Sequence, residues 1–577
     1  MDAGKVLISQ IFSKRLLEIP FYQRAYVWKE EQWDRLISDM EFVTDTRKPY
    51  FLGSVILKQG DAPRTWENFS DRKIVVDGQQ RLTTLLILLK VIALKTGKTK
   101  SFDNSFRLDD DDEEKKGPIA LVHGKNDIKN FNLVMDYTVA EKIAISEKSQ
   151  IIAAFNYFID KVDTKKIDKN AITQNVQFVC IELSEGEDEQ QVFDTINSLG
   201  VSLTTAELLK NYFFNKDNID EYQNYWYNTF ESSTEKQEYW EMEIDAGKKK
   251  RAMIDIFFDS YFQIFLQNKK YKVSAEDKIY YSRDDRLAQS YQDFIKKYCN
   301  NDKHEILGTL AEYANLFQDM FKPSYCKKSM LYASVIQRIN VIIFGLKNST
   351  LIPYLLFISK NVPDVVERNK IISTLEAYIM RRMVLHITTK NYNRLFTSLI
   401  LNDVISADDL VKYFRESDDT TMHIPSDEEL FKGFNESKLS NLQTKGIIYF
   451  IESYKRNLKD STSLLGFDSY SLEHLMPKKW RNEWDIPDTE EKQKQRDSVL
   501  LTLGNLAIIT QTLNASIRDS KWEDKKTGKN KEDSGLNTCA AGLYTMTNVL
   551  NQTIWDESQI KERAEWLYNQ AKEMWKI

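Results

Sequence analysis

Two stretches of the sequence place polar side chains where they could act on a phosphate, and the first is residues 73–90, KIVVDGQQRLTTLLILLK. Gly78 permits a sharp reversal of the chain, after which the N–H groups of a new helix would face an anion. Arg81 in the first turn could add a bidentate phosphate contact, and Asp77 could hold a metal ion or water. An ordinary strand, turn and helix with a surface Asp and Arg fits the spacing equally well, because a single glycine turn is a weak signal.

The second stretch combines a histidine with one acid, two asparagines and a lysine. Glu473 and His474 are adjacent, and Asn505, Asn514 and Lys525 follow at wider spacing. A neutral imidazole can take a proton from water, and the resulting hydroxide can attack a phosphodiester. A divalent ion held by Glu473 and Asn514 would stabilise charge on the phosphate and the leaving oxygen. Oxygen ligands of this kind suit Mg2+ or Mn2+ rather than zinc.

The other residues of this second stretch would support that chemistry. Asn505 would hydrogen-bond across the loop and fix the hairpin that orients His474, while Lys525 could neutralise the phosphate in the transition state. Pro477 would end the strand that carries the histidine and fix the exit of the chain. The alternative is a surface Glu–His pair with asparagines that form turns, and the spacing alone supports both interpretations.

The apolar patterns predict the elements that would position the first stretch. Residues 74–76 indicate a buried strand, and Gln79 would open an amphipathic helix. Residues 50–57 and 176–183 are further strand candidates, because they are rich in aromatic and β-branched side chains. These strands and the helices between them predict an α/β unit that closes near residue 215.

Around the second stretch we expect a hairpin followed by a helix. Residues 504–509 form the predicted second strand, with a turn before it. Asn514 would open a helix that continues through Ile517 and Trp522. The turn and the two strands would bring the histidine and the asparagines into one site.

Between residues 216 and 430 the pattern is helical and shows no alternation typical of strands. The adjacent Arg381 and Arg382 interrupt an apolar helix within this region. Neighbouring residues on a helix point about 100° apart, so both cannot face solvent from one apolar helix. At least one of them is expected to bind either an acid of the core or a phosphate.

Length and composition restrict the class of protein. A chain of 577 residues is too long for one core, so several domains are expected. The four cysteines form no CxxC pair, which argues against structural zinc and a disulfide framework and fits a reducing cytosol. The sequence shows neither a secretion signal nor an apolar run as long as a membrane span. The net charge of -6 predicts that any contact with DNA uses local basic patches or a metal.

On these stretches the chain resembles the GmrSD-type modification-dependent (type IV) restriction endonucleases, which fuse an N-terminal ParB-like NTPase domain to a C-terminal HNH (His-Me finger) nuclease. The matching stretches extend from near the first residue to near the last: IPFYQRAYVW (19–28), YFLGSVIL (50–57), VVDGQQRLTTL (75–85), VFDTINSLGVSLTTAELLKNYFF (192–214), LEHLMPKKW (472–480), LGNLAIITQTLNASIRDSKWEDKK (503–526) and TIWDESQIKERAEWLY (553–568). The helical middle matches more weakly.

The resemblance implies an α+β fold that is predominantly helical. It implies a ParB-like α/β domain at residues 1–215, a helical region at 216–430 and a ββα-metal (HNH) nuclease domain at 431–577. His474 would be the nuclease base within a His-x-x-Pro motif. Relatives often have Asp before this histidine, whereas this chain has Glu473, whose longer side chain alters the expected metal geometry.

The resemblance also implies that the N-terminal domain binds and hydrolyses an NTP, with GTP favoured. The nucleotide site would consist of five consecutive residues: Asp77, Gly78, Gln79, Gln80 and Arg81. Relatives place the residues that correspond to Tyr22, Gln23 and Arg24 near the nucleotide or the modified DNA. Asn197 and Lys210 belong to a third N-terminal motif whose role stays open.

The combined expectation is an antiphage, NTP-regulated DNA endonuclease or nickase of the bacterial cytoplasm that uses Mg2+ or Mn2+. Its partner would be double-stranded DNA, in particular modified phage DNA, and a homo-oligomer is left open. A second hypothesis is a nucleotide-switched DNA-binding protein that blocks phage replication without cutting. Its motivation is Glu473 in place of Asp and the lack of a strong basic patch. The aromatic cluster at 19–28 is the favoured place for recognition of a modification.

Overall fold

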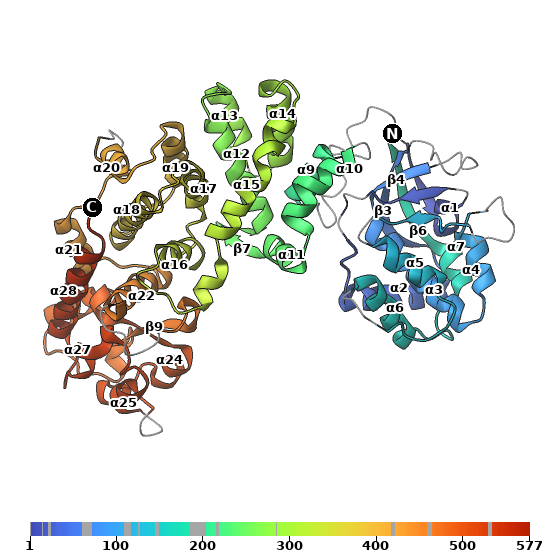
Figure 1. The fold of residues 1–577 in the computed structure, drawn as a ribbon. Coiled ribbons are helices and arrows are strands. Elements are labelled where there is room, and N and C mark those ends of the chain that lie inside the picture. The colour runs from blue at the N-terminus through green and yellow to red at the C-terminus, as the bar shows by residue number, and fades with distance from the viewer. Residues whose placement is uncertain are drawn as a thin grey trace. The chain divides into compact units, whose positions relative to one another are not determined.

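The computed structural model describes most of the chain. The described residues are 2–13, 15–20, 23, 25–60, 72–108, 117–124, 127–144, 149–183, 204–214, 218–247, 249–283, 286–416, 422–457, 464–528 and 534–577. The chain divides into two compact units, Met1–Tyr222 and Gln223–Ile577. Figure 1 shows a sheet with surrounding helices in the first unit and mostly helices in the second.

The N-terminal unit contains a mixed sheet with the strand order β1–β6–β3–β4–β2–β5 in the part that the structure describes. β3 pairs parallel with β6, and β2 pairs parallel with both β4 and β5, while the remaining pairs are antiparallel. The strands are β1 (Asp2–Leu7), β2 (Leu16–Glu18), β3 (Tyr50–Gln59), β4 (Arg72–Asp77), β5 (Leu121–Val122) and β6 (Val176–Leu183). The three strands predicted from the apolar pattern are confirmed as β3, β4 and β6.

Alternating side chains of these strands separate two apolar clusters. Val55 and Val75 point into the large core that the helices enclose, whereas Ile56 and Val76 belong to a small cluster with Ile181. Successive side chains of a strand point to opposite faces, so the helices cover one face of the sheet. The helices of this unit are α1 (Ile8–Ile11), α2 (Glu30–Thr46), α3 (Gln79–Lys95), α4 (Thr99–Phe106), α5 (Ile128–Asp136), α6 (Gln150–Lys161), α7 (Lys169–Asn175), α9 (Thr205–Phe213) and α10 (Ile219–Glu221).

Helix α3 begins at Gln79, as predicted, but it is not amphipathic. Its side chains are buried on every face from Leu82 to Leu94, because α4, α5, α6 and α7 all contact it. A helix that is apolar all round is buried inside a core. The N-terminus of α3 is therefore fixed against the end of β4 by the packing of the whole unit.

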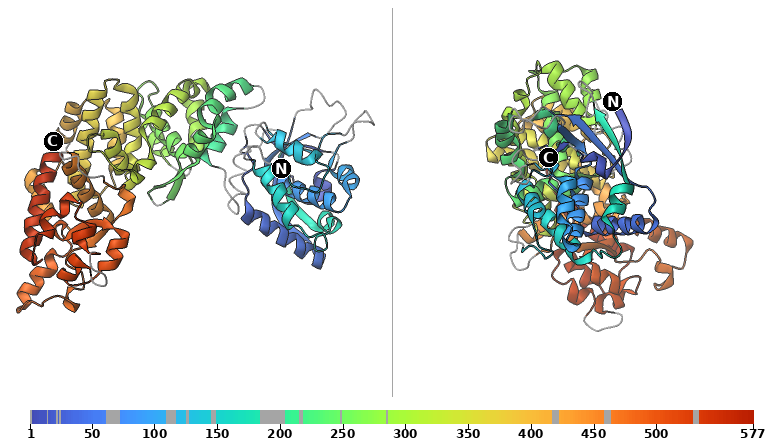
Figure 2. Two further views of the ribbon diagram at one scale, coloured as in Figure 1. Left: turned by 60° about the horizontal axis from the view of Figure 1, so that its bottom comes forward. Right: turned by 90° about the vertical axis from the view of Figure 1, so that its right-hand side faces the viewer.

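The C-terminal unit is helical over most of its length, and Figure 2 shows these helices from two further directions. Its elements before residue 440 are η3 (Tyr222–Glu231), α11 (Thr234–Glu241), β7 (Glu243–Ala246), β8 (Lys249–Ala252), α12 (Met253–Gln267), α13 (Ala275–Tyr281), α14 (Leu287–Tyr298), α15 (His304–Met320), α16 (Val335–Asn340), α17 (Ile352–Asn361), α18 (Val365–Val384), α19 (Tyr392–Leu401), α20 (Ala407–Glu416) and α21 (Asp427–Glu436). The short β7–β8 hairpin departs from the predicted all-helical pattern, because its lysines and acids carry no apolar alternation.

The last part of this unit surrounds a small hairpin with helices. The helices are α22 (Asn441–Asn457), α23 (Glu490–Val499), α24 (Gln511–Ile517), α25 (Trp522–Thr527), α26 (Leu536–Cys539), α27 (Thr547–Leu550) and α28 (Glu557–Met574). α22 contacts both strands of the hairpin and also α28. The fold is thus α+β and predominantly helical, as expected. None of the described helices combines the length and apolar character that a membrane span requires.

The two adjacent arginines of α18 are both buried and both have protein partners. Arg381 forms an ion pair with Asp427 over 2.7 Å and donates from Nε to the Trp575 carbonyl oxygen, also over 2.7 Å. Arg382 donates to the carbonyl oxygen of His423 over 2.9 Å. Arg381 thus has an acid as a partner, the first of the two predicted kinds, whereas Arg382 binds main-chain oxygens and its buried Nε has no hydrogen-bond partner.

Replacement of Gly78 by alanine should destabilise the N-terminal unit. Gly78 has a φ of 102°, and a Cβ there would lie 2.9 Å from Val55 Cγ2. We expect Gly78→Ala to lower the free energy of unfolding by roughly 1–3 kcal/mol, measured by chemical denaturation. Gly97→Ala is the matched control, because Gly97 also has a positive φ but open space around it. Equal losses in both variants would contradict the steric part of this prediction.

Candidate functional site

The second predicted stretch forms a two-stranded hairpin followed by a helix. β9 (Tyr470–His474) pairs antiparallel with β10 (Leu506–Thr510), and α24 follows β10 directly. His474 is the last residue of β9 and lies opposite Leu506, the first residue of β10. The histidine therefore stands where the strand gives way to the loop that contains Pro477.

The helix after the hairpin differs from the prediction at both ends. α24 begins at Gln511, because the Thr510 side chain caps it by accepting from the main-chain N–H of Leu513. It ends at Ile517, next to Arg518 with its positive φ of 32°, and α25 forms a separate helix. Asn514 accordingly lies inside α24 rather than at its start.

Asn505 is fully buried and joins the two sides of the hairpin loop. Its Oδ1 accepts from the main-chain N–H of Met476 over 2.8 Å and from Trp555 Nε1 over 3.0 Å. Its Nδ2 donates to the carbonyl oxygens of Met476 and Leu500 over 2.8 and 2.9 Å. Its own carbonyl oxygen accepts from the N–H of Leu475. All side-chain hydrogen-bonding capacity of this amide is thus used, and the bonds join Met476, in the loop after His474, to Leu500 and Trp555.

Glu473 and Lys525 form a buried ion pair beneath the same strand. Lys525 Nζ contacts Glu473 Oε1 and also donates to the carbonyl oxygen of His474 over 2.7 Å. Burial raises the pKa of Glu473 and lowers the pKa of Lys525, while their mutual attraction opposes both shifts. The lysine therefore positions the main chain at His474 through two contacts.

The imidazole of His474 is half-buried and electrically neutral near pH 7. Burial lowers its pKa to about 4, with Lys478 and Lys525 acting in the same direction and Asp519 opposing them. Among the described residues, no side chain hydrogen-bonds to this ring. A neutral ring with a free nitrogen can accept a proton from water.

The two predicted metal ligands are largely occupied by the protein itself. The Glu473 carboxylate binds Lys525, and Asn514 Nδ2 donates to Ser471 Oγ and to the Leu472 carbonyl oxygen over 3.0 and 2.8 Å. Within the described ranges, no group of three or more His, Cys, Asp or Glu side chains is arranged to hold a metal. Coordination by Glu473 would require its separation from the lysine, so this carboxylate as placed does not fit a metal ligand.

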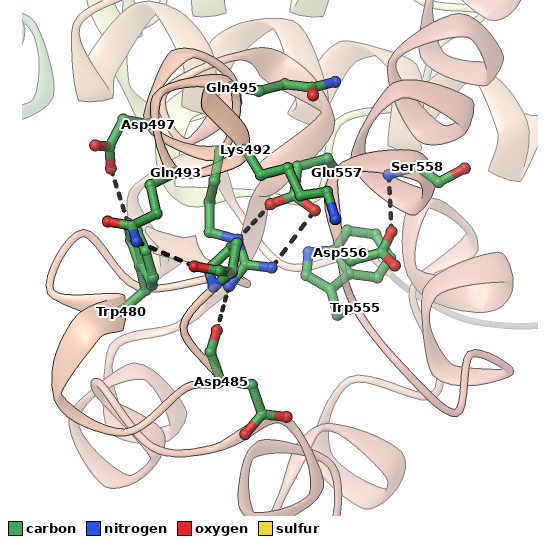
Figure 3. A network of polar contacts seen from close by, with 12 residues as sticks. Trp480, Asp485, Lys492, Gln493, Gln495, Asp497, Trp555, Asp556, Glu557 and Ser558 are labelled. Atoms are coloured by element: carbon green, nitrogen blue, oxygen red, sulfur yellow. Dashed lines mark hydrogen bonds and ion pairs between the residues drawn. The ribbon is translucent and has the colours of Figure 1, made fainter. Parts of the chain in front are cut away.

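A polar network fixes the loop that leaves the hairpin (Figure 3). Trp480 Nε1 donates to Asp497 over 2.9 Å, and the guanidinium of Arg496 lies 4.9 Å from the Trp480 ring centre. Arg496 also pairs with Glu557 at the start of α28 and donates to the Asp485 carbonyl oxygen over 2.7 Å. The loop after His474 is therefore tied to both α23 and α28.

Helix α28 also holds the turn before β10. Arg563 Nη1 donates to the carbonyl oxygens of Gly504 and Leu506 over 2.8 and 2.6 Å. A Cβ at Gly504 would overlap the carbonyl oxygen of Ile560, so only glycine permits this approach. The turn that contains Asn505 thus packs directly against α28.

In the N-terminal unit, the first predicted stretch forms β4, a turn at Gly78 and α3. Arg81 Nη2 pairs with Asp77 over 3.0 Å and donates to the Ser54 carbonyl oxygen over 2.8 Å. Its guanidinium lies over Gly53, where a Cβ would be 3.2 Å from Nη1. The buried Nε of Arg81 has no hydrogen-bond partner. This Nε is enclosed against Gly53, whereas the Arg81 side chain as a whole stays partly exposed.

Two glutamines bring the first N-terminal motif onto this turn. Gln80 Oε1 accepts from the Val27 N–H over 2.9 Å, and its Nε2 donates to the Ala25 carbonyl oxygen over 3.2 Å. Gln23 Nε2 donates to the Val75 carbonyl oxygen over 2.7 Å. The structure thus places Gln23 and the Asp77–Arg81 segment together.

The remaining predicted N-terminal residues have less evidence. Tyr22, Arg24 and Asn197 lie outside the described residues. Lys210 is buried in α9, and Gln79 is buried in the first turn of α3. Their predicted functional roles stay predictions.

Sequence analysis missed two residues that act on the His474 site. Asp519 raises the pKa of His474, and the sequence shows it only as one acid within the helix predicted from Asn514 through Trp522. Trp555 binds Asn505 from 50 residues away, and no spacing rule connects positions so far apart. Only the tertiary structure identifies both residues as part of this site.

Models of two protein domains match the chain. The model of the N-terminal domain of GmrSD restriction endonucleases matches residues 8–214, and the model of the C-terminal domain of these enzymes matches residues 424–570. Together the two matches cover more than half of the chain, and they contain both sites described above. A search of curated proteins found no match.

Removal of the charge on Lys525 should destabilise the C-terminal unit strongly. Lys525→Met leaves the Glu473 carboxylate buried without a partner, and we expect a loss of about 3–5 kcal/mol in the free energy of unfolding. Adding Glu473→Gln should restore part of that loss. Lys526→Met, which breaks a pair with the exposed Glu523, should cost less than about 1 kcal/mol. Chemical denaturation of the four proteins gives the comparison, and equal effects of the two lysine variants would contradict it.

Proposed function

The chain belongs to the GmrSD family of type IV restriction endonucleases, and we propose that it is an NTP-regulated DNA endonuclease or nickase that acts on modified or foreign double-stranded DNA. The observation that carries this proposal is the neutral imidazole of His474 at the end of β9, directly before the loop that the Asn505 hydrogen bonds hold at Met476. A neutral histidine with a nitrogen that can accept a proton is the group that a general base requires.

In the proposed reaction, His474 accepts a proton from a water molecule, and the water oxygen forms a bond to phosphorus. The bond from phosphorus to the leaving oxygen breaks, and that oxygen takes a proton from solvent. Asn505 positions the imidazole by holding the main chain of Leu475 and Met476. Lys525 fixes the carbonyl of His474, and neutralisation of the phosphate charge stays its proposed second role.

Mg2+ or Mn2+ is proposed as the cofactor, with a ligand set changed from the sequence-based expectation. Asn514 uses its amide nitrogen to bind β9, so its oxygen is the atom left for a cation. Asp519 has an exposed carboxylate that raises the pKa of His474, and it is the second proposed ligand. Mg2+ sites typically have few protein oxygens as ligands, and water molecules and substrate phosphate complete the coordination shell. When bound, the cation would stabilise negative charge on the phosphate.

We further propose that Asp77, Gly78, Gln79, Gln80 and Arg81 form the site that binds and hydrolyses an NTP, with GTP favoured. The partly exposed guanidinium of Arg81 and the start of α3 support a phosphate there. Recognition of a DNA modification is assigned to Tyr22, Gln23 and Arg24, and Asn197 and Lys210 are proposed to contribute to it.

The alternative function is a nucleotide-switched DNA-binding protein that blocks phage replication without cutting. The Glu473–Lys525 pair favours it, because this pair occupies the carboxylate that a metal-dependent nuclease would use. This alternative predicts tight DNA binding without any metal-dependent product.

Loss of the His474 side chain should abolish cleavage. We expect His474→Ala to lower the cleavage rate at least roughly 100-fold, because the base is removed, while GTP hydrolysis by the N-terminal unit continues. Matched modified and unmodified phage DNA, with Mg2+ or Mn2+ and with or without GTP, provide the assay. His423→Ala is the control, since His423 pairs with Glu429 on the surface. Unchanged DNA products with His474→Ala would refute the nuclease mechanism, and a lack of cutting by the unaltered protein would favour the binding switch.

The pH dependence of cleavage should report the low pKa of His474. Its neutral form is the active base, so kcat/KM should rise only up to about pH 4–5 and stay flat between about pH 5 and 8. Lys478→Gln removes a nearby positive charge and should shift the acid limb to higher pH. Lys479→Gln, at the adjacent exposed position, should leave it in place. An inflection between pH 6 and 7 in the unaltered protein would contradict the assigned environment.

A further inference from the structure

The β7–β8 hairpin of the C-terminal unit carries lysines that the fold itself does not use. Its two strands pair antiparallel up to Ala246, which lies opposite Lys249. Lys249 and Lys250 are both exposed, and within the described ranges neither of them forms an ion pair with an acid. The sequence of the tip adds Lys248 in the run GKKKR at 247–251. These charges take no part in the packing of the unit, which leaves them available for an external anion.

The other charges around the hairpin neutralise one another. Asp245 lies opposite Lys250 in the ribbon, but its carboxylate pairs with Lys347 over 2.7 Å. Arg251 pairs with Asp259 of α12 over 3.1 Å. Each of these pairs joins one charge of the hairpin to an opposite charge outside it, so the lysines of the tip remain in excess. The hairpin is therefore a local basic patch in a chain whose net charge is -6.

The two exposed lysines belong to opposite faces of the ribbon. Lys249 and Lys250 are consecutive in β8, and successive side chains of a strand point to opposite faces. At Gly247, in the turn between the strands, no described atom lies within 4 Å of the position that a Cβ would take. The major groove of B-DNA admits a two-stranded ribbon and is bordered by two phosphate backbones. Positive charge on both faces of a ribbon is complementary to these two backbones.

The base of the hairpin is tied to the segment that leads into the His474 strand. Lys347, which pairs with the hairpin, follows the π-helix η6 (Val341–Gly345) by two residues. η6 contacts the 3-10 helix η9 (Phe467–Ser469), and β9 begins directly after η9 and ends at His474. A duplex bound by the hairpin would thus be bound to the same packed unit as the proposed base.

We propose that the β7–β8 hairpin enters the major groove of a DNA duplex, where Lys249 and Lys250 contact the two bordering phosphate backbones. The choice of double-stranded DNA as the partner rests on the proposed function. A lysine on a phosphate carries no sequence information, so this contact holds any duplex, modified or unmodified. Recognition of a modification is left to another part of the chain.

The hairpin can be tested by the binding of the full chain to a fluorescent duplex, followed by anisotropy in EDTA at several salt concentrations. Lys249→Gln combined with Lys250→Gln removes two phosphate contacts. We expect the slope of log K against log salt to fall in magnitude by about 2 and binding at about 0.1 M salt to weaken about tenfold. The loss should be the same for modified and unmodified DNA.

Two further double variants serve as controls. Lys269→Gln combined with Lys270→Gln removes an adjacent pair of exposed lysines in the same unit that already pair with Asp403 and Glu305, and it should leave the slope unchanged. Lys249→Arg combined with Lys250→Arg keeps both charges and should bind like the unaltered protein. This variant, together with chemical denaturation of each protein, separates lost charge from lost folding.

An unchanged slope in the glutamine variant of the hairpin overturns the inference, as does an equal change in the Lys269 and Lys270 control. An equal loss of affinity for single-stranded DNA of the same sequence also overturns it, because a single strand has no groove. Cleavage is measured separately with Mg2+. A protein that shows the expected slopes but cuts no DNA would contradict the proposed nuclease alone, and one that cuts DNA with unchanged slopes would contradict the hairpin contact alone.

Discussion

The hydrogen bonds of the buried Asn505 amide are the interaction on which the nuclease-side site depends. An amide without partners inside a core would be strongly unfavourable, so its contacts with Met476, Leu500 and Trp555 specify one arrangement of the loop. Those contacts fix the main chain directly after His474. The position of the imidazole therefore depends on an amide that does not contact the ring itself.

Much of both sites could be predicted from local sequence, and the failures have a common cause. The strand before Gly78, the start of α3 at Gln79 and the strand after Asn505 follow from apolar patterns and turn chemistry. The Glu473–Lys525 pair joins residues 52 positions apart, and no spacing rule encodes it. The prediction that Glu473 binds a metal did not include Lys525, whose positive charge pairs with this carboxylate. Charge pairing between distant elements decides the role of a buried carboxylate.

The N-terminal motif shows the same distinction between residue type and role. A run of glutamines beside an arginine predicts groups that face a ligand, yet Gln80 uses both ends of its amide to bind the main chain at Ala25 and Val27. It therefore holds residues 25–27 against the start of α3. Arg81 is the residue of this motif whose partly exposed guanidinium could contact a phosphate.

The dependence of the Asn505 turn on α28 has a consequence for biosynthesis. Gly504 packs against Ile560, and Arg563 binds the carbonyl oxygens around Asn505, so the turn is completed by residues made more than 50 positions later. During synthesis on the ribosome, His474 is added to the chain well before the residues of α28 that hold this turn. The segment that carries the proposed base therefore acquires its final geometry only after α28 has emerged, which delays any cutting activity until synthesis of this unit is finished.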